Sequence, residues 1–128
     1  MIIELTNYQE VRNFDGIGGY GDPEITVKVT SYVGDFPAKT STTKSLLRQD
    51  NIAIWNGSVK DTVEIYSTAD RIVVNPIILD YETFGNPRDF SPPGKQITAN
   101  QIFVGNVFQN VSFEGDDTSC KLTISLIK

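Results

Sequence analysis

Carboxylates are the main side chains in this sequence that could carry out chemistry. The 128 residues include 16 acidic side chains, one cysteine and no histidine. Without an imidazole, the thiol of Cys120 has no usual general base to activate it, and the common zinc ligand sets are missing. Glycoside hydrolysis needs only two carboxylates, but they must face each other across a cleft. Asp61 and Glu64 are an odd number of residues apart and would face opposite sides of a strand. We therefore expect a protein that is not an enzyme.

A glycine-rich segment has the spacing of a nucleotide-binding motif but the wrong surroundings. Gly16, Gly18 and Gly21 match G-x-G-x-x-G, which holds a pyrophosphate only between a strand and the start of a helix. Here Asp22 and Pro23 follow, and then a strand pattern. The formal charge is −5, the pI is about 4.6, and the basic residues are scattered. Because nucleic acid requires a concentrated positive face, we expect neither a nucleotide cofactor nor a nucleic-acid partner.

Two further groups leave ligand binding open. Asp116 and Asp117 could supply oxygen atoms to a calcium ion in a turn, although their spacing is not that of an EF-hand loop. Whether they bind a cation therefore stays open, and we expect no metal or other cofactor. Trp55 could stack on a sugar ring, which would make the chain a carbohydrate-binding module. The alternative interpretation is that its indole covers one end of the core.

The segments that must position these side chains alternate apolar and polar residues. This period of two is typical of strands with one buried face. It is clearest at residues 25–30, 107–113 and 120–126, where Cys120, Leu122, Ile124 and Leu126 fall on one side. The turn-forming residues 114–117 predict that the last two segments form an antiparallel hairpin. Residues 71–79 predict an edge strand or a bent strand, because Pro76 cannot donate to a ladder.

Other local signals predict one more hairpin and at most one short helix. Asn56 and Gly57 favour a type I′ turn between two strands, since asparagine and glycine adopt positive φ readily. Residues 41–50 are the one candidate for a helix of two or three turns. Residues 2–5 could add a short strand.

Together these patterns predict one domain over residues 1–128 with an all-β fold. We expect an antiparallel β-sandwich, immunoglobulin-like or jelly-roll-like, with about seven to eight strands and long glycine- and proline-rich loops. A second cysteine is absent, so the antibody-type pattern is not met, and no apolar run reaches the length of a membrane span.

Two long segments predict where this sandwich makes contacts. We expect residues 1–23 to form an extended N-terminal arm and residues 80–101 a long loop, because such segments are usually functional. The candidate interaction residues are aromatic: Tyr20, Trp55, Tyr81, Phe84 and Phe90.

By analogy with small β-domains of phage particles, we expect a non-enzymatic assembly subunit. It would be a virion accessory protein, such as a capsid decoration or a tail or head-attachment component, that binds copies of itself or a larger protein shell. We expect protein partners, a homo-oligomer or a multi-protein complex, no membrane partner, and a location in the virion or the cytoplasm. A carbohydrate-binding module is the alternative.

Overall fold

A computed structural model of the chain describes residues 1–11, 20–81, 85–98, 101, 109–115 and 120–127. The elements of these residues are all strands. They are β1 (Ile2–Glu10), β2 (Pro23–Val33), β3 (Phe36–Thr42), β4 (Leu47–Arg48), β5 (Ile54–Thr62), β6 (Arg71–Asp80), β7 (Arg88–Asp89), β8 (Lys95–Thr98), β9 (Gln109–Glu114) and β10 (Cys120–Ile127).

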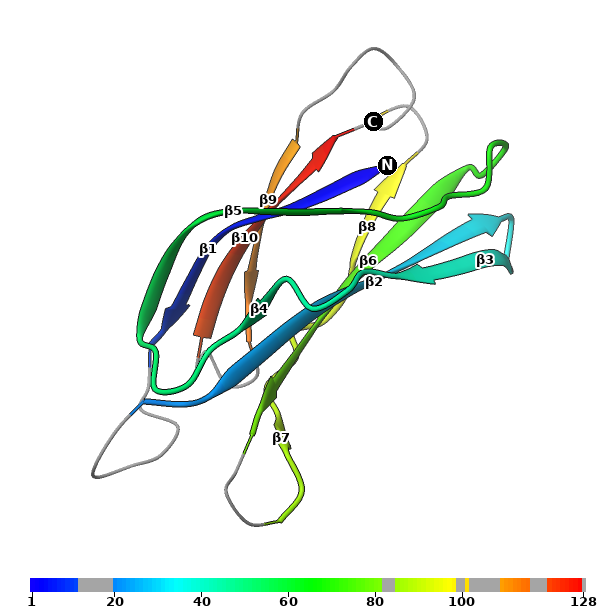
Figure 1. Ribbon diagram of the computed structural model, residues 1–128. Helices are drawn as coiled ribbons and strands as arrows, with labels where there is room; N and C mark the ends of the chain where they lie inside the picture. The colour runs from blue at the N-terminus through cyan, green and yellow to red at the C-terminus, as the bar shows by residue number, and fades with distance from the viewer. Residues whose placement is uncertain (12–19, 82–84, 99–100, 102–108, 116–119, 128) are drawn as a thin grey trace.

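The strands form two antiparallel sheets that lie face to face (Figure 1). One sheet has four strands in the order β5-β1-β10-β9. The other has six, in the order β3-β2-β6-β7, with β4 paired to β2 and β8 paired to β6. The predicted all-β, antiparallel sandwich is confirmed.

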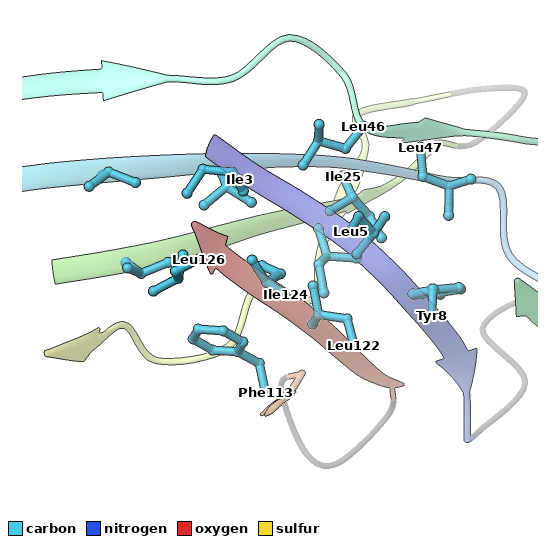
Figure 2. Close-up of a cluster of buried hydrophobic side chains, with 14 of the residues drawn as sticks. Ile3, Leu5, Tyr8, Ile25, Leu46, Leu47, Phe113, Leu122, Ile124 and Leu126 are labelled. Carbon is cyan, nitrogen blue, oxygen red and sulfur yellow. The ribbon is translucent and has the colours of Figure 1, made fainter. Parts of the chain in front are cut away.

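Alternation along the strands builds the core between the sheets (Figure 2). The four-stranded sheet contributes Ile3, Leu5, Phe113, Cys120, Leu122, Ile124 and Leu126, and the six-stranded sheet contributes Ile25, Val27, Val29, Ile72, Val74, Ile78 and Ile97. Each buried branched side chain stabilises the fold by about 1.5–3 kcal/mol relative to leaving it in water. The predicted inward face of residues 120–126 is confirmed, as is their antiparallel pairing with residues 109–114.

Pro76 lies inside a sheet, at a place where the missing N–H does little harm. β6 pairs with β2 over its whole length, whereas β8 covers only residues 71–74 of its other side and β7 only residues 79–80. The N–H of Ile78, two residues further on, points away from β2 and donates to Oγ of Ser91 at 3.0 Å. The nitrogen of Pro76 therefore faces the gap between β8 and β7.

The predicted hairpin turn at Asn56 and Gly57 is wrong. Both residues lie within β5, where Asn56 pairs with Asn7 and accepts a hydrogen bond from its side chain at 2.7 Å. A Cβ at Gly57 would lie 2.8 Å from the Trp55 ring, so the ring would have to shift if this position carried a side chain. The tight turn with a positive φ occurs instead at Gly34, between β2 and β3, with a φ of 59°.

The predicted N-terminal arm is also wrong for residues 2–10. β1 lies between β5 and β10, and its alternating apolar residues have no exposed surface, so it is a core strand. Residues 12–19 lie outside the described residues. The segment 80–101 contains β7 and β8 and is therefore not one continuous loop. Residues 41–50 form no helix; they contain the end of β3 and β4, and they bury Leu46 and Leu47 against the core.

A β-bulge in β1 turns polar side chains into the interior. The register with β10 shifts between Leu5 and Asn7, so Leu5 and Tyr8, three residues apart, both point inward. Glu10 follows on the same face and is also buried. The Tyr8 hydroxyl has no hydrogen-bond partner among the residues that the structure describes. Burial raises the pKa of Tyr8, and the negative charges of Glu10 and Asp80 contribute less.

Replacing Tyr8 by Phe should therefore not weaken the fold. A buried hydroxyl without a partner costs about 1–3 kcal/mol, so we expect Tyr8→Phe to match or exceed the wild-type free energy of unfolding by about 1 kcal/mol at pH 7. Above pH about 10 the unfolded tyrosine ionises while the buried one keeps its proton, so the wild type loses stability that the variant keeps. Urea denaturation at pH 7 and pH 10.5 measures both effects, with exposed Tyr20→Phe as control. A variant clearly less stable than the wild type at pH 7 would show that the hydroxyl contributes to stability, contrary to this prediction.

Gly115, at the end of β9, should not tolerate a side chain. A Cβ at this position would lie 2.7 Å from the carbonyl oxygen of Phe90 and would also meet Sγ of Cys120. Because a backbone atom must move, we expect Gly115→Ala to lower the free energy of unfolding by about 1–3 kcal/mol. Gly57→Ala is the matched control, since its Cβ meets only the movable ring of Trp55. Equal losses in the two variants, measured by urea denaturation, would show that the backbone contact is unimportant.

Candidate functional site

Several connections meet at one end of the sandwich, which we call the loop end. It is the end at which β1 and β6 finish and β2, β5 and β10 begin, at the lower left of Figure 1. The register places Glu10 opposite Cys120, and Gln9 opposite Ile54. In the other sheet Asp80 lies opposite Pro23. Residues far apart in the sequence are thus brought together here.

An ion pair between a buried carboxylate and a partly exposed arginine lies at the loop end. Asp80, the last residue of β6, has no exposed surface. Its Oδ2 accepts a hydrogen bond from Nη2 of Arg88 at 2.8 Å, and its Oδ1 accepts one from the N–H of Asp22 at 2.7 Å. Arg88 lies directly opposite Asp80 in the β6–β7 ladder, with its guanidinium carbon 5.4 Å from the ring centre of Phe90. These contacts offset the cost of removing the carboxylate from water.

The other polar side chains of the loop end hold the backbone of neighbouring segments. Oδ1 of Asp22 accepts the N–H of Asn51 at 2.6 Å, and Oδ1 of Asn51 accepts the N–H of Tyr20 at 2.8 Å. Oε1 of Glu10 accepts the N–H of Gly21 at 2.9 Å. Asn51 has a φ of 51°, in the left-handed region that asparagine tolerates better than most residues. These side chains therefore position the chain.

A second group lies beside the first, on the outer face of the six-stranded sheet. The guanidinium carbon of Arg48 is 3.8 Å from the ring centre of Tyr81. Glu24 accepts a hydrogen bond from the Tyr81 hydroxyl at 3.3 Å, and its carboxylate is 3.6 Å from Nη1 of Arg48. Tyr81 is thus engaged on its face by Arg48 and at its hydroxyl by Glu24.

Apolar side chains are exposed around these polar groups. Val11, just after β1, is 49% exposed; Tyr20 is 47% exposed; and Ile54, the first residue of β5, is 58% exposed. Of these three residues, Tyr20 was among the predicted interaction residues, whereas Val11 and Ile54 were not. Ile54 continues the apolar run that starts at Ile52, but it lies opposite the exposed Gln9 and therefore on the outer face of the four-stranded sheet.

The remaining predicted interaction residues are spread over different environments. Trp55 and Phe90 are partly buried and pack against the core, so the interpretation of Trp55 as a cover for the core is the one that the packing supports. Tyr81 is half-buried in the group with Arg48. Phe84 lies outside the described residues. Among the described candidates, Tyr20 is therefore the most exposed aromatic side chain at the loop end, and Tyr81 lies there in the group with Arg48.

Neither a metal cluster nor a membrane-spanning helix is found in the part of the chain that the structure describes. No group of three or more His, Cys, Asp or Glu side chains there could hold a metal ion. Asp116 and Asp117 lie outside these residues, so the question of a cation at that turn stays as the sequence left it. No helix among the described residues is long and apolar enough to cross a bilayer.

Comparisons with known proteins relate the chain to one fold. No family model and no curated protein matches it. Among solved structures, a C2 domain of plant extended synaptotagmin 1 is 18% identical, with a TM-score of 0.59 over 97% of this chain and 88% of that one. A C2 domain protein from Ramazzottius varieornatus is 14% identical, with a TM-score of 0.59 over 98% of this chain and 85% of that one.

Human GIVD cytosolic phospholipase A2 is also similar. A structure of it in complex with an inhibitor and terbium chloride is 14% identical, with a TM-score of 0.55. The match covers 98% of this chain but only 17% of the phospholipase, so this chain corresponds to a small part of that enzyme.

These similarities correct the functional expectation. The structural neighbours are C2 domains and not proteins of phage particles, so the prediction of a virion accessory protein is wrong. The carbohydrate-binding alternative finds no support among these neighbours either. The chain has the β-sandwich fold of C2 domains.

Proposed function

We propose that this chain is a non-catalytic module that docks onto the surface of a neutral lipid bilayer through its loop end. The observation that carries the proposal is the gathering of Val11, Tyr20 and Ile54 at that end, each about half exposed. Aliphatic side chains gain free energy in the boundary between headgroups and acyl chains, and tyrosine favours this boundary because its ring is apolar and its hydroxyl polar.

Hydrogen bonds fix the backbone at or next to these three residues before any partner binds. Ile54 belongs to β5, and the N–H of Glu10, next to Val11, donates to the carbonyl of Ala53 at 2.8 Å. Tyr20 is fixed through its N–H by Asn51. Little conformational entropy then has to be lost when the end meets a surface.

Charge determines which lipid surface is favoured. The chain carries a formal charge of −5, and Asp50 is exposed at the loop end. Anionic headgroups would repel such a module, whereas zwitterionic phosphatidylcholine would not. Insertion of each half-exposed side chain contributes about 1 kcal/mol, so binding should be weak and reversible.

The similarity to known structures also favours a phospholipid surface as the partner. One structural neighbour is named as a phospholipase, an enzyme that acts on phospholipid. The expectation of no membrane partner rested on the lack of an apolar run long enough to span a bilayer. Shallow insertion of a few apolar side chains requires no such run, so the proposal replaces that expectation.

Removing two of the apolar side chains should weaken lipid binding. We expect the double variant Tyr20→Ser, Ile54→Ser to partition onto phosphatidylcholine vesicles at least about tenfold less than the wild type, because it loses the apolar area that inserts. Cosedimentation with vesicles, in buffer with a chelator, measures this partition.

The matched control removes exposed apolar side chains from the opposite end. Val33 and Phe36 face each other across the β2–β3 turn and are 42% and 77% exposed. Val33→Ser, Phe36→Ser should bind vesicles as the wild type does. Equal losses in both double variants, or a wild type that leaves the vesicles unbound, would refute the proposal. Tighter binding to phosphatidylserine than to phosphatidylcholine would refute its charge argument.

A further inference from the structure

The loop end carries an acidic group of residues that raises the question of a bound cation. Glu10, Asp22 and Asp80 come from three segments and hold the same stretch of backbone around Gly21 and Asn51. Calcium and other hard cations take carboxylate and amide oxygens as ligands. A structural neighbour was solved with terbium chloride, which supplies a cation of this kind.

The oxygen atoms of these three described residues do not fit a divalent cation. Both oxygens of Asp80 are occupied, one by Arg88 and the other by the N–H of Asp22. Oδ1 of Asp22 and Oε1 of Glu10 also accept backbone N–H groups. In the described part of the chain, no three carboxylate, thiol or imidazole groups lie close enough to hold a metal ion. A cation would have to break several of these hydrogen bonds.

We propose that the guanidinium of Arg88 takes the place of a divalent cation at the loop end, so that this end is organised without metal. A fully buried carboxylate requires a nearby positive charge, and Arg88 supplies it 2.8 Å from Oδ2 of Asp80. The inference concerns how the end is held together, and it does not depend on a lipid being the partner.

The placement of Arg88 suits this role. Its backbone pairs directly with Asp80, and its guanidinium lies 5.4 Å from the ring centre of Phe90, so the charge is held from two sides. The arginine side chain stays charged at every pH at which the protein is folded. The occupancy of a metal site, by contrast, depends on the concentration of the metal ion. The loop end therefore keeps its form whether or not calcium is present.

The test replaces the arginine and offers the metal alone. In a chelator, we expect Arg88→Gln to lower the midpoint of thermal unfolding by at least about 5 °C. Addition of millimolar Ca²⁺ should restore more than half of that loss in Arg88→Gln and leave the wild type within about 1 °C of its value in chelator. Arg48→Gln is the matched control, an arginine of the same end that also contacts an aromatic ring and a carboxylate. It should show no response to Ca²⁺.

A double variant keeps the proposal testable if Arg88→Gln fails to fold. Arg88→Gln, Asp80→Asn removes both charges and should fold without any response to Ca²⁺, because no buried charge then needs a partner. Two results would overturn the proposal: Ca²⁺ stabilising the wild type as much as Arg88→Gln, or Arg88→Gln gaining nothing from Ca²⁺. Since no lipid is present, neither result bears on vesicle binding.

Discussion

The arrangement of the loop end depends on how one carboxylate, that of Asp80, is compensated for its removal from water. Asp80 terminates a central strand with no exposed surface, so its charge must be balanced within the protein. Arg88 and the N–H of Asp22 meet that requirement, and in doing so they fix the course of β7 and the start of β2. The side chain of Asp80 therefore reinforces the ladders that already pair β6 with β2 on one side and with β7 on the other. Because the Arg88 side chain is partly exposed, the main cost of this pair is the removal of the Asp80 carboxylate from water.

The bulge in β1 and the hydrogen bonds around it explain why apolar side chains remain exposed beside this buried charge. The bulge turns Tyr8 and Glu10 inward, and Glu10 then binds the backbone of Gly21. Because the polar side chains point in and hold the backbone, Tyr20 and Ile54 are left on the surface. Two carboxylates are thus buried at this end while Tyr20 and Ile54 are exposed, and Asp50 remains in water.

The sequence predicted the layered fold well because the alternation of apolar and polar residues is a local signal of a buried strand face. It failed where spacing or tertiary contacts override local preference. Asn56 and Gly57 favour a turn by themselves, but the pairing of β5 with β1 holds Asn56 in a strand, where its amide oxygen accepts a hydrogen bond from the Asn7 side chain. The length of β1 was underestimated because its bulge interrupts the alternation after Leu5.

The group around Asp80 was not predictable, since its members lie on segments far apart in the sequence. The functional analogy failed because small β-sandwiches serve many roles.

Both ends of the sandwich expose apolar side chains, but they differ in the carboxylates that lie beside those side chains. At the β2–β3 turn, Phe36 is 77% exposed and follows Asp35, whose side chain is in water. Any surface that covers Phe36 must also desolvate that carboxylate, which is costly in contact with hydrocarbon. The edge strand β3 also carries Pro37 and Lys39, which discourage pairing with another strand. At the loop end the carboxylates of Asp80 and Glu10 are already buried and bonded inside the protein. For the proposed lipid partner, covering Tyr20 and Ile54 therefore desolvates neither of these two carboxylates, whereas the exposed Asp50 has to remain in water at the edge of the contact.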